Sequence, residues 1–167
     1  MKFERLNLPD FSNTRAVVTV FALLILALPF VFRPYVVTGG SMEPTYHEGQ
    51  AILIEKLTPH FYVWRGEVLV IRNPHDKSVT EVKRVVGLPN EDITIGQNNV
   101  TVTHPDGRAE TFGADTSIGR GQTEFFHMYL GPRDYMALGD NRSKSSDSRT
   151  FGAVQAGDII GHVIMQI

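Results

Sequence analysis

The pattern of apolar and polar positions divides this chain of 167 residues into two unlike parts. Residues 16–32 form one continuous apolar run without a charged side chain, and Arg15 and Arg33 stand at its two ends. After Arg33 the apolar stretches are short, rich in β-branched residues and separated by glycine, proline and asparagine. The first pattern is typical of a helix in an apolar environment, and the second is typical of short strands joined by turns.

The run over residues 16–32 predicts a single membrane anchor that is not cleaved. About 17 residues with a rise of 1.5 Å each extend roughly 25 Å, at the short end of the range for a transmembrane helix. A buried core helix would carry a polar stripe, but only Thr19 interrupts this run. A cleaved signal peptide would end in a small-x-small site, where the chain reads LPFVFRPYVV. A surface amphipathic helix would need a charged face, which the run lacks.

The basic residues near this run give a weak indication of its orientation. Lys2, Arg5 and Arg15 precede it, and Arg33 follows it directly. Because lysine and arginine favour the cytoplasmic end of a membrane helix, the N-terminal side leans toward the cytoplasm. We therefore expect a cytoplasmic segment over residues 1–15, a transmembrane anchor over 16–32 and a β-rich extracytoplasmic domain over 33–167.

The remainder of the chain predicts an all-β fold, either a β-sandwich or a partly open barrel. Turn signals separate the strands, the stretch from Ile93 to Val102 has the form of a hairpin, and no long amphipathic helix follows the apolar run. The expected strands are Tyr35–Thr38, Gln50–Glu55, Val68–Arg72, Val79–Val86, Asp92–Ile95, Val100–Thr103, Asp134–Leu138 and Ile159–Ile167.

Composition narrows the classes of function. The formal net charge of -2 gives no basic excess, so we expect no nucleic-acid partner. Without cysteine there can be no disulfide, thiol nucleophile or cysteine-bound zinc. The six histidines are not paired at the spacing of metal ligands, so we expect neither a metal nor a cofactor.

Three local clusters carry residues that could do chemistry. Ser41 follows two glycines, Lys83 lies within a β-branched strand, and a polar block runs from Gly139 to Arg149. Taken one at a time, the first is more often just a turn, the second usually lies on a solvated strand face, and the third could be a flexible polar loop. Together they supply a hydroxyl, an amine and a scaffold that could orient them.

A serine hydroxyl needs a base to become a nucleophile, and a neutral lysine amine can replace the usual histidine. A free lysine has a pKa of about 10.4, so a lysine base must be buried among apolar groups to lose its proton near neutral pH. Val82 and Val85 flank Lys83 in the sequence, which fits burial. We expect hydroxyl groups rather than carboxylates around the amine, because a carboxylate would hold the proton on it.

At these clusters the chain resembles the type I signal peptidases, which are Ser/Lys serine proteases. Ser41-Met42-Glu43-Pro44-Thr45 is similar to the family's nucleophile box, and Gly66-Glu67-Val68-Leu69-Val70 is similar to a structural strand. The segment from Lys83 to Pro89 is similar to the box of the general base. Gly139-Asp140-Asn141-Arg142, followed by Ser145, Asp147, Ser148 and Arg149, is similar to a fourth box. The resemblance covers the chain from the apolar run to about Gly152.

The resemblance implies a role for each matching residue. Ser41 would attack the scissile carbonyl, and Lys83 would take its proton and later deliver water. Ser145 would hydrogen-bond and orient the lysine amine. Asp147 and Arg149 would pair to hold the loop, Met42 would pack near the site, and Arg84 would be structural. Shallow pockets for small residues at positions -1 and -3 of the substrate would be lined by Tyr35, Val37 and Val82.

The resemblance also implies the setting. The partners would be preproteins with signal peptides, the lipid bilayer and the secretion translocon. The location would be the cytoplasmic membrane of a bacterium, crossed once, with the protease domain outside. A specialised conjugation-type peptidase, a self-cleaving repressor of the SOS response and an inactive membrane-tethered β-domain remain as alternatives.

Some positions depart from the family pattern. Gly39 stands where some members have a serine that donates to the oxyanion, so the second donor is open. Tyr46 replaces a common leucine, and Asn90 replaces a common glycine. The second subdomain of larger members would be reduced to little more than a hairpin over residues 104–131.

Overall fold

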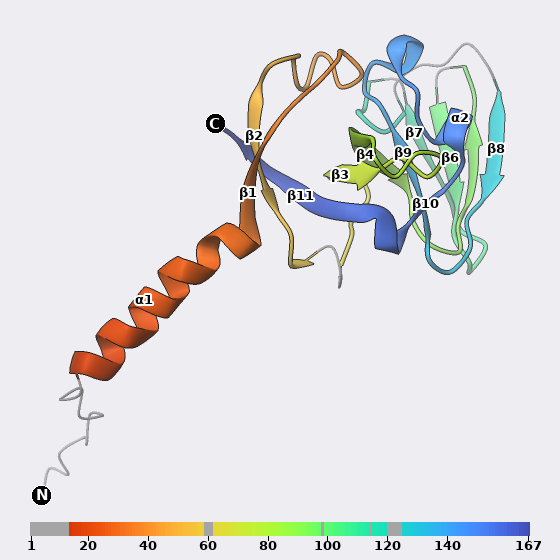
Figure 1. Ribbon diagram of the computed structural model, residues 1–167. Helices are drawn as coiled ribbons and strands as arrows, with labels where there is room; N and C mark the ends of the chain where they lie inside the picture. The colour runs from red at the N-terminus through yellow and green to blue at the C-terminus, as the bar shows by residue number, and fades with distance from the viewer. Residues whose placement is uncertain (1–13, 59–61, 98, 114, 120–124) are drawn as a thin grey trace, which may run out of the picture.

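The computed structural model describes residues 14–58, 62–97, 99–113, 115–119 and 125–167 (Figure 1). One helix, α1 (Thr14–Val31), leads directly into β1 and extends away from a body made of two antiparallel sheets. In spatial order the larger sheet contains β1 (Phe32–Val36), β2 (Ala51–Glu55), β11 (Ile159–Gln166), β3 (Val68–Arg72), β4 (Thr80–Gly87), β9 (Asp134–Leu138) and β10 (Val154–Gln155). The smaller sheet contains β7 (Ala109–Gly113), β6 (Asn99–Thr103), β5 (Asp92–Ile95) and β8 (Phe126–Tyr129).

The mostly β architecture agrees with the fold class expected from the sequence, and each expected strand is present within a few residues of its expected bounds. Sequence reasoning missed β7, β8 and β10. The first two are short strands with largely exposed side chains, so they carry little of the alternation that marks a half-buried strand.

The two strands described within residues 104–131 pair with other strands of the smaller sheet. β7 and β8 lie at opposite edges of the smaller sheet, where β7 pairs with β6 and β8 pairs with β5. The expected turn between β5 and β6 falls at residue 98, which lies outside the described residues, but the two strands pair antiparallel as expected.

The apolar run forms a helix, but a membrane crossing is not found. No helix in the described part of the chain combines the length and the apolar character that a bilayer crossing requires. The bounds expected for the anchor, residues 16–32, agree with those of α1 to within two residues.

The larger sheet curls so that strands far apart in its order approach each other. The Tyr35 hydroxyl on β1 hydrogen-bonds the Thr80 hydroxyl on β4, although three strands separate β1 from β4 in the sheet. The curled face encloses an apolar cluster that includes Val37, Ile54 and Val70. The result is a half-barrel in which the edge strand β1 approaches β4.

A second apolar cluster joins the two sheets. Val86 and Leu138 from the larger sheet pack with Ile93 and Val102 from the smaller one, and all four side chains are fully buried. Gly87 ends β4 at this junction, where a Cβ would lie only 2.6 Å from a methyl group of Leu130. The smaller sheet therefore packs directly against β4, the strand that carries Lys83.

Candidate active site

Ser41 lies in the tight connection between β1 and β2. Gly39 has a φ of +76°, a conformation that glycine adopts without strain, and it turns the chain just before the serine. The N–H of Asn141 donates to the Ser41 carbonyl oxygen at 2.9 Å, and its side-chain amide donates to the Gly40 carbonyl oxygen at 3.1 Å. The polar block after β9 thus fixes the backbone around the hydroxyl.

Lys83 points from the middle of β4 toward this serine. It lies opposite Leu69 of β3, and its residue is only 2% exposed. Its Nζ atom is 3.1 Å from Ser41 Oγ, which is hydrogen-bond distance. Two residues separated by 42 positions in the sequence are therefore brought together as a nucleophile and a possible base.

A carboxylate also contacts the amine, so the expectation of hydroxyl groups alone around Lys83 was wrong. Glu81 Oε2 lies 2.7 Å from Lys83 Nζ, and its other oxygen accepts a hydrogen bond of 2.6 Å from the Asn73 side chain. The physical reason is strand alternation, because residues two apart on β4 share one face of the sheet. That periodicity was the sequence signal that could have revealed Glu81.

Ser145 does not hydrogen-bond the lysine amine as expected. Its hydroxyl is buried and has no hydrogen-bond partner among the described residues. The hydroxyl packs instead against Gly139, where any Cβ would collide with it and would lie 2.5 Å from the Ser41 carbonyl oxygen. Gly139 lies so close to the Ser145 side chain and the Ser41 backbone that only glycine fits at this position.

Asp147 and Arg149 form the expected pair. Arg149 Nε donates to one oxygen of the Asp147 carboxylate at 2.7 Å, and its Nη2 donates to the other oxygen at 2.7 Å. Burial alone would raise the pKa of Asp147, but the charge and hydrogen bonds of Arg149 and the Gly139 N–H hold that pKa below its ordinary value. The Ser145 hydroxyl lowers the pKa of Asp147 the least, because it lies near the carboxylate without forming a hydrogen bond to it. Asp147 is thus a buried anion that ties α2 (Ser148–Phe151) to the strand end at Gly139.

Arg84 forms an ion pair and Met42 packs in an apolar cluster. The Arg84 guanidinium donates a hydrogen bond to each oxygen of the buried Asp140 carboxylate, at 2.8 and 2.6 Å. The Thr45 hydroxyl donates to the same carboxylate at 2.5 Å. Met42 is fully buried in the apolar cluster of the half-barrel. The loop that carries Ser41 is therefore fastened by an ion pair on one side and by an apolar anchor on the other.

A hollow of about 320 Å³ opens beside the serine and the lysine. Val82 lines it, whereas Val37 is buried in the adjoining cluster and Tyr35 packs against that cluster. Charged or polar residues to which the sequence analysis gave no role also border this hollow, among them Lys144 and Thr38. The complete lining is Thr38, Gly39, Gly40, Ser41, Val79, Thr80, Glu81, Val82, Lys83, Lys144 and Ser146.

With this geometry established, comparison with known proteins decides the family. A family described as signal peptidase, peptidase S26, matches residues 11–167. The chain belongs to this signal peptidase family. The signal peptidase I T of Bacillus subtilis (strain 168) is 32% identical over 155 residues, covering 88% of this chain and 79% of that protein. The signal peptidase I of Bacillus licheniformis is 30% identical over 147 residues, covering 83% and 77%.

A solved structure is also similar to this chain. A signal peptidase I from Enterococcus faecalis V583 aligns with a TM-score of 0.49 and 23% identity, covering 62% of this chain and 97% of that one.

The structure shows the conformation or surroundings of two residues that depart from the signal peptidase pattern, Asn90 and Gly39. Asn90 has a φ of +64° and is the one non-glycine residue with positive φ in the described part of the chain. Asparagine adopts this conformation more readily than most side chains, so it can replace glycine there. Gly39 lines the hollow without a side chain, so no hydroxyl at this position can donate to a substrate oxygen.

Proposed function

We propose that this chain is the serine endopeptidase that removes signal peptides from exported preproteins, with Ser41 as nucleophile and Lys83 as general base. The observation that carries the proposal is the 3.1 Å contact between the Lys83 amine and the Ser41 hydroxyl at the edge of a hollow. Membership of the signal peptidase family supports the substrate class. Small side chains at substrate positions -1 and -3 would lie against Tyr35, Val37 and Val82.

The proposed reaction proceeds in two steps. The neutral Lys83 amine takes the proton of Ser41 Oγ as this oxygen attacks the scissile carbonyl carbon, and the ammonium then gives that proton to the departing amine. Lys83 next takes a proton from water, which attacks the carbonyl carbon of the acyl-ester. The bond from this carbon to Ser41 Oγ then breaks, the ammonium returns the proton to Ser41 Oγ, and the signal peptide is released. The backbone N–H of Ser41 would donate to the carbonyl oxygen as it becomes negative.

We expect Ser41→Ala and Lys83→Met each to lower kcat for a precursor peptide by about a thousandfold or more. The reason is that the nucleophile and the base act together, and each change removes one of them. The measurement is cleavage of a synthetic precursor by the full chain in detergent, with the residue at position -1 varied between alanine and leucine.

Ser143→Ala and Lys77→Met are matched controls, since they remove the same groups from exposed positions outside the hollow. Both controls should cleave at the wild-type rate. Activity close to that of the wild type in Ser41→Ala or Lys83→Met, with an unchanged melting temperature, would rule out this dyad.

We further infer that α1 attaches the enzyme to a membrane, and that the protease domain acts on the outer side of a bacterial cytoplasmic membrane. Apolar side chains cover the helix on all sides and remain exposed, among them Phe21 at 63%, Leu24 at 59% and Phe30 at 76%. A helix with no polar face and no packing against its own domain needs an apolar environment elsewhere.

Flotation with vesicles of phosphatidylcholine tests this attachment. The wild-type chain should float with the vesicles, whereas Leu24→Glu should weaken the association about tenfold or more, because the carboxylate would enter an apolar layer. Ile164→Glu places the same charge on an exposed apolar position of β11 and should float like the wild type. Equal flotation of both variants would contradict attachment through α1.

A further inference from the structure

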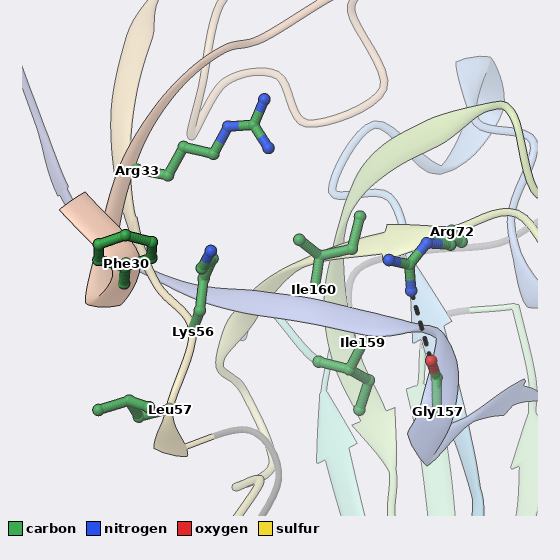
Figure 2. Close-up of a pocket in the computed structure, with 8 residues that line it drawn as sticks. All are labelled: Phe30, Arg33, Lys56, Leu57, Arg72, Gly157, Ile159 and Ile160. Carbon is green, nitrogen blue, oxygen red and sulfur yellow. Dashed lines mark hydrogen bonds between the residues drawn. The ribbon is translucent and has the colours of Figure 1, made fainter. Parts of the chain in front are cut away.

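A second hollow lies at the foot of α1, away from the serine and the lysine (Figure 2). Its volume is about 410 Å³, and it is bordered by residues from α1, β1, the segment after β2, the end of β3, the turn before β11 and the start of β11. Three of the residues around it are the basic side chains Arg33, Lys56 and Arg72. Its apolar lining includes Phe30, Leu57 and Ile160.

The strand register explains why the three cations gather there. Arg33 on β1 lies opposite Ile54 on β2, and Lys56 follows Ile54 by two residues, so both belong to the same face of the sheet. Arg72 follows Val70 by two residues on β3, and Val70 and Ile54 pack in one apolar cluster. All three basic side chains therefore border the inner face of the half-barrel at the end from which α1 departs.

None of these cations has an ion-pair partner within the described ranges. Arg72 reaches only the Gly157 carbonyl oxygen, at 3.5 Å, as Figure 2 shows. The neighbouring acids are engaged elsewhere: Asp158 pairs with Lys77 at 2.5 Å, and Glu55 accepts hydrogen bonds from Thr58. A chain with a net charge of -2 thus keeps three positive groups around one hollow without a negative partner.

We propose that this hollow binds the phosphate of an anionic phospholipid headgroup. The inference rests on the proposed attachment of α1 to a membrane, because that attachment places the end of α1, and hence the hollow beside Phe30, at the level of the headgroups. Basic side chains beside an apolar membrane segment attract anionic headgroups. Phe30 and Leu57, both exposed apolar side chains, would face the acyl chains below the phosphate.

Two exposed aromatic side chains lie in a connection that also contributes to the hollow. Tyr62 and Trp64 are 67% and 65% exposed, and their rings stack with centroids 6.5 Å apart. They belong to the same connection between β2 and β3 that begins with Lys56 and Leu57. Tyrosine and tryptophan favour the boundary between headgroups and acyl chains, so this connection has side chains suited to a membrane surface.

Native mass spectrometry of the full chain in a zwitterionic detergent tests the proposal, with equal amounts of phosphatidylglycerol and phosphatidylcholine added. The wild type should retain phosphatidylglycerol in preference to phosphatidylcholine. Arg33→Gln and Lys56→Gln should each lower that retention about fivefold, and the double variant about 25-fold. Arg133→Gln, an exposed cation at the turn before β9, should behave like the wild type.

Competition with inorganic phosphate distinguishes a lipid headgroup from a soluble anion as the ligand of this hollow. Phosphate should compete with phosphatidylglycerol only weakly, because it lacks the acyl chains. Strong phosphate binding without retention of phosphatidylglycerol would identify a site for a soluble anion and overturn the lipid proposal. Equal retention of both lipids, or retention that is unchanged in the double variant, would overturn it as well.

Cleavage of a soluble precursor peptide in the same detergent keeps this proposal separate from the proposed function. The double variant Arg33→Gln/Lys56→Gln should cleave the peptide at the wild-type rate, since neither residue borders the hollow beside Ser41. An inactive wild type would contradict the proposed function, while the lipid measurement would still report on the second hollow.

Discussion

At the scale of single residues, the Lys83 amine lies between two groups with opposite effects. Its contact with Ser41 Oγ suits a base that accepts a proton, whereas the Glu81 carboxylate, 2.7 Å away, favours the charged ammonium. The hydrogen bond from Asn73 holds Glu81 in place. Other charged groups near the amine are few: Lys144 borders the same hollow, while β3 and β9 present only apolar side chains opposite this part of β4.

Glu81→Gln should therefore raise the rate of peptide cleavage. The change removes the negative charge 2.7 Å from the Lys83 amine and keeps the shape of the side chain, so we expect kcat/KM at pH 7 to rise by about threefold. The measurement is cleavage of the precursor peptide at a fixed pH. Glu110→Gln makes the same change on β7 in the other sheet and should leave kcat/KM unchanged. A folded Glu81→Gln enzyme with an unchanged or lower kcat/KM would show that this carboxylate does not oppose the base.

At the scale of elements, the segment between β9 and β10 contains little regular structure and is held by the Asp147–Arg149 ion pair and its hydrogen bonds. It contains one turn of 3-10 helix, Arg142–Lys144, and the single turn of α2. Asp147 caps α2, accepts the Gly139 N–H at 3.0 Å and pairs with Arg149. The Arg149 guanidinium also donates to the Arg142 carbonyl oxygen at 2.8 Å, so one ion pair joins both ends of the segment.

Asp147→Asn should lower the free energy of unfolding by about 3 kcal/mol at pH 7, because it leaves a partly buried guanidinium without its anion. The native pKa of Asp147 lies below its ordinary value of 3.8, so the stabilisation is complete above that value and is lost as the pH falls through the native pKa. The difference between the variant and the wild type should therefore shrink below about pH 4. Urea unfolding at pH 7 and near pH 3 measures both effects.

A second Asp-x-Arg pair offers the control for this experiment. Asp106 and Arg108 make the same 2.7 Å contact, but their side chains are 55% and 70% exposed. Because exposed ion pairs contribute little, Asp106→Asn should change the free energy of unfolding by less than about 1 kcal/mol. Equal losses in the two variants would contradict a special role for the buried pair.

At the scale of the whole molecule, the strand that carries Lys83 packs in two apolar clusters. β4 contributes Val82 to the half-barrel and Val86 to the junction with the smaller sheet. The smaller sheet therefore supports the strand that carries Lys83, even though it contributes no side chain to the hollow beside Ser41. We expect the two sheets to unfold together.

Ile93→Ala should lower the free energy of unfolding by about 3 kcal/mol and leave a single transition, since its fully buried side chain fills the junction between the sheets. Peptide cleavage well below the melting temperature should stay close to that of the wild type. Ile164→Ala, at a position that is 49% exposed, should be nearly neutral. Two separate transitions in urea or on heating would contradict a shared core.

The sequence by itself determined the strands and the residues that could do chemistry. Alternation of β-branched residues marked eight of the strands, because the pleat repeats every two residues whatever the tertiary context. Ser41 and Lys83 could be named because they stand in motifs that resemble a known family. Asp147 and Arg149 could be paired for the same reason.

Only the tertiary structure decided what surrounds those residues. The carboxylate of Glu81, the isolated Ser145 hydroxyl and the gathering of Arg33, Lys56 and Arg72 all depend on side-chain directions and on the curl of a sheet. Strands that are distant in the chain approach in space through this curl, and a sequence pattern reports only neighbours along the backbone. The sequence therefore named the residues that we propose as nucleophile and base, but the balance of charge around them follows from the fold.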